Sequence, residues 1–192
     1  IGGEMYELLT MANRTTEDVF SLLDNLLKWT KSQIGNLNVV YQDVDAVEVV
    51  DSVIDVFNMV AGLKKITIRE EKPEKLPVCT DIDMLKTIIR NLLSNAIKFS
   101  NENSEVLVKM EEQGDTVVVS VKDSGCGIDE EGQQKLLHTD THFSTFGTNN
   151  EEGSGLGLLL CQDFAVKIGG KLWFTSKEGE GSIFSFSIPV KK

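Results

Sequence analysis

Three short segments of the chain contain residue types that could contact a phosphorylated ligand. The first holds Asn91, Asn95 and Lys98, whose spacings of four and three residues would place them on one face of a helix. Asparagine is unfavourable inside a helix because its amide competes for backbone hydrogen bonds. The carboxamide oxygen of Asn95 could instead bind Mg²⁺, and Lys98 could neutralise phosphate charge. The spacing fits a solvated polar stripe equally well, so both interpretations stay open at this point.

The second segment covers residues 123–128 and follows a predicted strand. Gly125 and Gly127 permit a tight turn that side chains would block. The carboxylate of Asp123 on such a turn could accept a hydrogen bond from the exocyclic amine of adenine, a contact that guanine does not offer. The alternative is an Asp-Ser-Gly turn that only connects two elements.

The third segment opens a predicted helix and consists of Gly153, Ser154, Gly155, Leu156 and Gly157. Exposed amides at a helix start attract phosphate, and glycines let the phosphate approach closely. The glycine spacing differs from the Rossmann fingerprint and from the Walker A loop. We expect the polar residues 139–153 before it to form a mobile lid loop that hinges on these glycines.

Hydrophobic periodicity and turn residues predict the elements that position these segments. Helices are predicted over residues 4–34, 45–61, 81–99, 132–137 and 156–168, and strands over residues 39–41, 66–69, 105–111, 116–122, 171–176 and 182–188. This order predicts an α+β fold in which one mixed sheet packs against helices. The wide apolar face of residues 4–34 indicates a helix of a bundle that needs partner helices, or else one that packs on its own domain.

The net charge, the cysteine spacing and the apolar runs of the chain exclude several classes of partner and site. The chain has 192 residues and a formal charge of −11, which argues against nucleic acid and against anionic membranes as partners. Its three cysteines have no Cys-x-x-Cys spacing, so a disulfide framework or zinc cluster is not expected and a reducing compartment fits best. No signal peptide and no apolar run of membrane-spanning length is visible.

Taken together and in this order, the three segments resemble the asparagine box and the two glycine boxes of the ATP-binding catalytic domain of sensor histidine kinases. The resemblance covers residues 36–190, and residues 22–33 are similar to the second helix of the family's dimerisation and phosphoacceptor hairpin. It implies the Bergerat fold, a two-layer α/β sandwich with a mixed sheet, preceded by one long helix. The implied domains are residues 1–35 for the incomplete hairpin and 36–192 for the catalytic domain.

Carried over by position, the resemblance implies ATP and Mg²⁺ as cofactors. Asn95 would hold the metal, Asn95 and Lys98 would act in catalysis, and Asp123 would bind the adenine amine. The nucleotide-binding residues that it implies are Asn91, Asn95, Lys98, Asp123, Gly125, Gly127, Ile128, Gly153, Ser154, Gly155, Leu156 and Gly157.

The implied activity is that of a protein-histidine kinase that passes the γ-phosphoryl group of Mg-ATP to a histidine, for relay to a response-regulator receiver domain. The resemblance also implies a homodimer in the full-length protein and a cytoplasmic location, as part of a membrane-anchored bacterial sensor. The only histidines are His138 and His142, and neither lies in a phosphoacceptor box. The acceptor histidine would therefore belong to another chain.

Two other functions fit part of the pattern. One is an ATPase clamp of the gyrase or heat-shock chaperone kind, which shares the fold. The other is a nucleotide-binding pseudokinase that serves as a docking module, because residues 138–157 contain no lysine or arginine to contact the γ-phosphate.

Overall fold

The structure is a computed structural model that describes residues 5, 16, 19, 20, 23–32, 35, 38–137 and 156–190. The chain divides into two compact units, residues 1–37 and 38–192. In the smaller unit, residues 23–32 are helical, and the Thr30 hydroxyl donates to the Leu26 carbonyl at 2.8 Å. Leu23 and Leu27 are exposed on this helix. Its pairing with partner helices stays a prediction.

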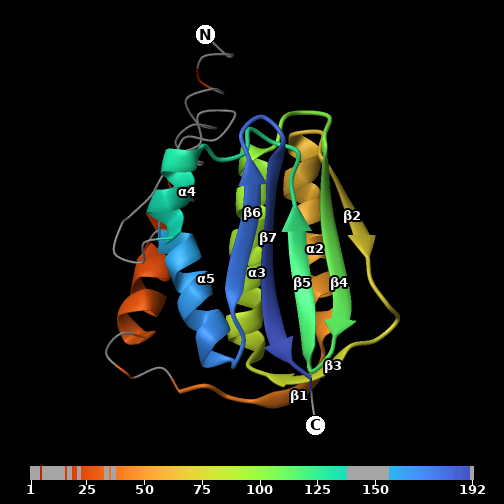
Figure 1. Cartoon of the computed structure of the whole chain (residues 1–192), viewed down its shortest axis with the longest axis vertical. Helices are drawn as coiled ribbons and strands as arrows, with labels where there is room; N and C mark the ends of the chain where they lie inside the picture. Colours follow the sequence, from red (N-terminus) through yellow and green to blue (C-terminus); the bar gives the residue numbers. More distant parts are fainter. Residues whose placement is uncertain are drawn as a thin grey trace. The chain divides into compact units, whose positions relative to one another are not determined.

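A mixed sheet of five strands forms one layer of the larger unit, in the order β2-β4-β5-β7-β6 (Figure 1). The strands are β2 (Thr67–Glu71), β4 (Glu105–Gln113), β5 (Thr116–Lys122), β6 (Leu172–Lys177) and β7 (Gly181–Pro189). β2 is parallel to β4, whereas the β4–β5, β5–β7 and β6–β7 pairs are antiparallel. The mixed sheet predicted from the sequence is confirmed.

The second layer consists of helices on one face of this sheet (Figure 1). These are α2 (Ala46–Leu63), α3 (Ile82–Phe99) and α5 (Leu156–Lys167), while the short α4 (Glu130–Leu137) lies between β5 and α5 in the chain. The core lies between the layers because alternate strand residues and one face of α3 are both buried there. Its most buried members include Leu85, Ile88, Ile89, Leu92, Val106, Val108, Val119, Val121, Phe186 and Ile188.

The region before α3 differs from the prediction. The strand predicted at residues 39–41 was wrong, because the strand lies further along the chain as β1 (Gln42–Asp45). A second short strand, β3 (Pro77–Thr80), occupies positions expected to be a loop and a helix start, and it pairs with β1. Pro77 is tolerated because it is the first residue of the strand, where a missing N–H costs little. Helix α3 begins after Asp81, whose carboxylate accepts the first backbone amides of the helix at 3.0 Å.

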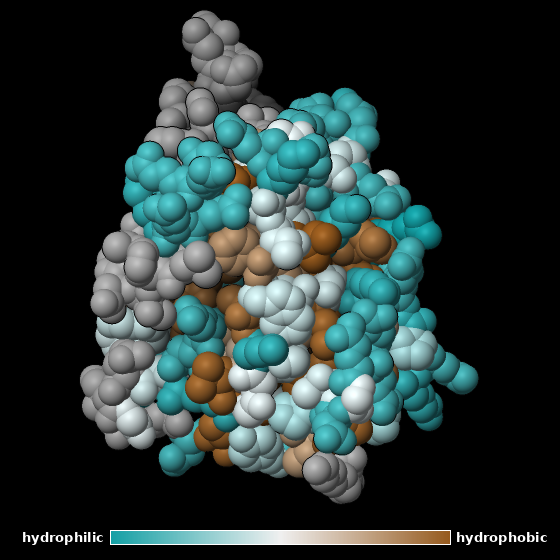
Figure 2. Space-filling model, in the orientation of Figure 1, coloured by the Kyte–Doolittle hydropathy of each residue, from teal (hydrophilic) through white to brown (hydrophobic). Residues whose placement is uncertain are grey.

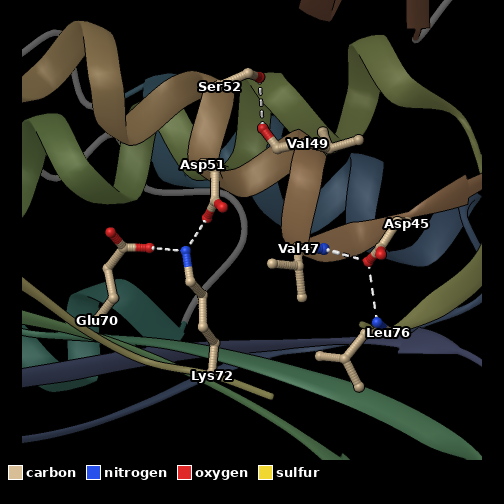
Figure 3. A network of polar contacts seen from close by, with 8 residues as sticks. All are labelled: Asp45, Val47, Val49, Asp51, Ser52, Glu70, Lys72 and Leu76. Atoms are coloured by element: carbon tan, nitrogen blue, oxygen red, sulfur yellow. Dashed lines mark hydrogen bonds and ion pairs between the residues drawn. The ribbon is translucent and has the colours of Figure 1, made fainter. Parts of the chain in front are cut away.

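The start of α2 is capped by Asp45. Asp45 Oδ1 accepts the N–H of Val47 and that of Leu76, each at 2.9 Å (Figure 3). One side chain therefore caps the helix and fixes the chain that leads into β3.

The face of the sheet opposite the helices is open to solvent. Hydrophilic residues dominate over β2 and β4, while paler and more hydrophobic residues lie over β6 and β7 (Figure 2). On this face Ser120 and Ser185 pair across β5 and β7, with their hydroxyls 2.8 Å apart. None of the helices that the structure describes is long and apolar enough to span a membrane.

Candidate functional site

Helix α3 presents the first predicted segment along one side. Asn91, Asn95 and Lys98 are partly exposed, whereas the intervening Leu92, Leu93 and Ala96 are buried against the core. The Asn91 amide donates to the Thr87 carbonyl at 2.9 Å, so its Nδ2 is engaged by the helix itself. The Asn95 side chain makes no hydrogen bond to any described residue. The last turns of the helix therefore carry two amide side chains and an ammonium group along one side.

The Asp123 carboxylate lies at the end of β5 and is almost completely buried, with 5% of the residue exposed. Its Oδ1 accepts the N–H of Gly125 at 2.9 Å and that of Ser182 at 3.2 Å. Among the described residues, none donates a hydrogen bond to Oδ2. Burial raises the pKa of Asp123 above its ordinary value, and the backbone hydrogen bonds oppose that rise.

Close backbone approaches fix the turn after Asp123. A Cβ atom on Gly125 would lie 2.1 Å from the Phe99 carbonyl oxygen, and one on Gly127 would lie 2.0 Å from the Lys177 carbonyl oxygen. Gly127 also has a φ of +64°, which L side chains rarely adopt. The turn is thus held between the end of α3 and the β6–β7 hairpin, and only glycine fits at either position.

The next residue, Ile128, is partly exposed and lies beside the same hairpin. Its N–H donates to the Ser176 hydroxyl at 2.9 Å, and its carbonyl accepts the side-chain amide of Gln133 at 2.7 Å. Both bonds fix the backbone where the turn leads into α4.

The third predicted segment is described only from Leu156 onwards, at the start of α5. Leu156 is buried, and a Cβ atom on Gly157 would lie 2.6 Å from Asn91 Oδ1. The Cys161 thiol, one turn later, lies 3.7 Å from the Ile88 carbonyl on α3. Both glycine-containing segments therefore contact α3, the second segment at its last residue and the third beside Asn91.

Several predicted positions lie outside the described residues. These are Gly153, Ser154 and Gly155, the proposed lid over residues 139–153, and the two histidines His138 and His142.

Sequence reasoning missed the contribution of the β6–β7 hairpin. The Ser182 N–H donates to the Asp123 carboxylate, and the Ser176 hydroxyl accepts the N–H of Ile128. The backbone at Gly181 approaches Asp123 so closely that a Cβ atom on Gly181 would lie 2.2 Å from the Asp123 carbonyl oxygen. The Gly-Glu-Gly run at residues 179–181 was visible only as a hairpin turn. Its position beside Asp123 depends on the pairing of β5 with β7, which no local pattern reveals.

The site offers a metal ion few protein ligands. The part of the chain that the structure describes contains no group of three or more His, Cys, Asp or Glu residues that could hold a metal ion. Mg²⁺ accepts a single amide or carboxylate when phosphate oxygens and water complete its octahedron. A partly exposed Asn95 without a described hydrogen-bond partner fits that role.

The structure therefore places a buried carboxylate on a glycine turn next to an amide-bearing helix and a glycine at a helix start, on one α/β sandwich. Residues 80–192 match the family model of the histidine kinase-, DNA gyrase B- and HSP90-like ATPases. The chain belongs to this family.

The similar proteins specify the class further. The chain is 31% identical over 171 residues to the adaptive-response sensory kinase SasA of Rippkaea orientalis. The aligned region covers 88% of this chain and 43% of that protein. The catalytic domain of histidine kinase ThkA superimposes with a TM-score of 0.68 at 30% identity, covering 79% of this chain and 96% of that one. The larger unit therefore carries the ATP-binding catalytic domain of a sensor histidine kinase, with the predicted Bergerat fold.

The match to relatives is partial in length. The chain spans less than half of the curated relatives that head the comparison, at 43%, 44% and 16% of their lengths. A structure of ThkA in complex with the response regulator TrrA has the same fold, with a TM-score of 0.76 at 23% identity, covering 97% of this chain and 52% of that one.

Proposed function

We propose that this domain binds Mg-ATP and transfers the γ-phosphoryl group to a histidine supplied by another chain. The observation that carries the proposal is the buried Asp123 carboxylate, whose Oδ1 is engaged by two backbone amides while Oδ2 is left for a ligand donor. The exocyclic amine of adenine is such a donor, whereas guanine presents a carbonyl oxygen there and would meet the carboxylate with repulsion.

The residues proposed to bind the triphosphate lie on α3 and at the start of α5. Lys98 would neutralise phosphate charge, Asn91 would orient the phosphates, and Asn95 would hold Mg²⁺. Bound there, the metal ion would neutralise charge on the transferring phosphoryl group. The domain's own contribution is positioning, because in-line phosphoryl transfer needs little covalent chemistry from the protein. Gly153, Ser154 and Gly155 are proposed to complete the phosphate contacts.

The acceptor and the relay partner are proposed from the relatives. Residues 1–35 would be the second helix of a dimerisation and phosphoacceptor hairpin, and the catalytic domain would begin at residue 36. In the full-length protein, a homodimer would present the acceptor histidine, and a receiver domain would take the phosphoryl group from it. The ThkA–TrrA complex supports a response regulator as partner. We place the domain in the cytoplasm, where ATP is available.

The test is incubation of the chain with labelled ATP, Mg²⁺ and a separate hairpin that carries the acceptor histidine. Acid-labile label should accumulate on the hairpin, and Asn95→Ala should abolish the transfer. Rapid ATP hydrolysis without the hairpin would instead favour an ATPase clamp. Tight ATP binding without transfer or hydrolysis would favour a pseudokinase that serves as a docking module.

A further inference from the structure

A buried lysine outside the predicted site donates hydrogen bonds to the end of α3, the helix that carries Asn95 and Lys98. Lys64 follows the last residue of α2, and only 7% of it is exposed. Its Nζ donates to the carbonyl of Ile97 at 3.0 Å and to the carbonyl of Lys98 at 2.8 Å. Both acceptors belong to the last turn of α3.

The last carbonyls of a helix have no partner within the helix, and the helix dipole makes them favourable acceptors for a cation. Solvent would satisfy these carbonyls if the end of α3 were exposed. Burying an ammonium group instead carries a desolvation cost, which is tolerated where the charge is fully engaged. A buried charge at this position therefore indicates that the last turn of α3 must hold one geometry.

That turn is the part of α3 that meets the turn after Asp123. It contains Lys98, follows directly on Asn95, and ends at Phe99, whose carbonyl oxygen lies against Gly125. A shift of the turn would move the side chains proposed for metal and phosphate relative to Asp123.

We propose that Lys64 is a positioning residue of the nucleotide site, which clamps the last turn of α3 so that Asn95 and Lys98 face the metal and phosphates. This inference rests on the proposed binding of Mg-ATP. Lys64 acts on the site through the carbonyls of Ile97 and Lys98. It should therefore change the metal-dependent part of nucleotide affinity more than the metal-independent part.

The chain provides a matched control in Lys72. Lys64 links the end of α2 to α3, whereas the Nζ of Lys72 links α2 to the sheet layer, through Asp51 on α2 and Glu70 on β2 (Figure 3). Both of these acceptors are carboxylates, and neither lies on α3. Lys72→Met thus removes an exposed lysine bridge of α2 and leaves the last turn of α3 untouched.

The experiment is calorimetric titration of the purified chain with a non-hydrolysable ATP analogue, with and without Mg²⁺. The readout is the dissociation constant measured without Mg²⁺ divided by the one measured with Mg²⁺. A partly unfolded fraction of the protein affects both constants equally and cancels in this ratio. Lys64→Met should lower this ratio on the order of tenfold, as loss of an outer-shell support of a metal ligand does. Lys64→Arg and Lys72→Met should keep the wild-type ratio.

An unchanged ratio in Lys64→Met would overturn the inference, as would an equal fall in Lys72→Met. If circular dichroism shows that Lys64→Met does not fold, Lys64→Gln is measured instead, because it replaces the ammonium group with a neutral amide donor. An intermediate ratio in that variant supports the inference, and a wild-type ratio overturns it. Failure of the wild-type chain to bind the analogue would overturn the proposed function itself, which separates the two failures.

Discussion

The carbonyl oxygen of Phe99 lies 2.1 Å from the position that a Cβ atom on Gly125 would occupy. The end of α3 and the turn after Asp123 are therefore in direct backbone contact, and any side chain at position 125 must push them apart. We expect Gly125→Ala to lower the free energy of unfolding by about 1–3 kcal/mol and to weaken nucleotide binding. Denaturant titration followed by circular dichroism measures the first effect.

Gly62 is the control for this substitution. It lies inside α2, and a Cβ atom there would meet nothing within 4 Å. Gly62→Ala should raise the free energy of unfolding by about 0.5–1 kcal/mol, because alanine loses less backbone entropy in a helix. A similar loss of stability in both variants would contradict the role given to the Phe99–Gly125 contact.

The buried Asp123 carboxylate should make the unliganded domain less stable as pH rises. Because burial raises the pKa of Asp123, the folded state holds this proton at pH values where the unfolded state has already released it. Stability from this group is therefore lost between the ordinary carboxyl pKa and the raised one, and stays lower above it. Asp123→Asn keeps an acceptor for the Gly125 and Ser182 amides but carries no charge.

We expect Asp123→Asn to melt at a higher temperature than the wild type near neutral pH, and the difference to shrink towards about pH 4. Thermal melts across this range, without nucleotide, provide the measurement. A variant that is less stable than the wild type at every pH would show that the carboxylate stabilises the fold, contrary to the desolvation argument.

Lys65 is one of two described non-glycine residues with positive φ, at +55°, and Asn103 is the other at +60°. A left-handed conformation costs a lysine about 1 kcal/mol, whereas asparagine tolerates it better. Lys65→Gly should therefore raise the free energy of unfolding by up to about 1 kcal/mol, and Asn103→Gly by less. A loss of stability for Lys65→Gly would mean that the 3.8 Å ion pair of Lys65 with Glu102 outweighs the strain. Equal gains in the two variants would contradict the difference expected between lysine and asparagine.

The three free cysteines should react very differently with a thiol reagent. Cys126 is exposed between the two glycines of the turn, Cys79 is partly exposed, and Cys161 is buried. Burial also raises the pKa of the Cys161 thiol, which suppresses the reactive thiolate. Mass spectrometry of the native protein should find Cys126 labelled first and Cys161 only on unfolding. Fast labelling of Cys161 would indicate that the contact between α3 and α5 opens readily.

The sequence predicted the elements that have a clear local signature. The β4–β5 hairpin, the buried face of α3 and the start of α5 at Leu156 follow from periodicity and turn residues, and the structure confirms them. Strand β3 was missed because Pro77 marks a break, and only its pairing with β1 shows that the residues after it are extended.

Long-range features could not be predicted in the same way. The hydrogen bond from Ser182 to Asp123 depends on residues 59 positions apart, and the bonds from Lys64 to α3 span more than thirty. A single polar residue near a hairpin or a helix end gives no signal of such a partner. The polar groups proposed to touch the nucleotide were recognisable by motif, whereas the groups that hold them in place were not.

The most direct test of the account is calorimetric titration of the chain with Mg-ATP and with Mg-GTP, for the wild type and for Asp123→Asn. We predict saturable binding of Mg-ATP to the wild type, with Mg-GTP weaker by at least about tenfold, since one hydrogen bond to a charged group contributes about 1.5–3 kcal/mol. Asp123→Asn should lose affinity for Mg-ATP by a similar factor. Equal affinities for the two nucleotides, or unchanged ATP binding in the folded variant, would contradict the assignment of Asp123 to adenine.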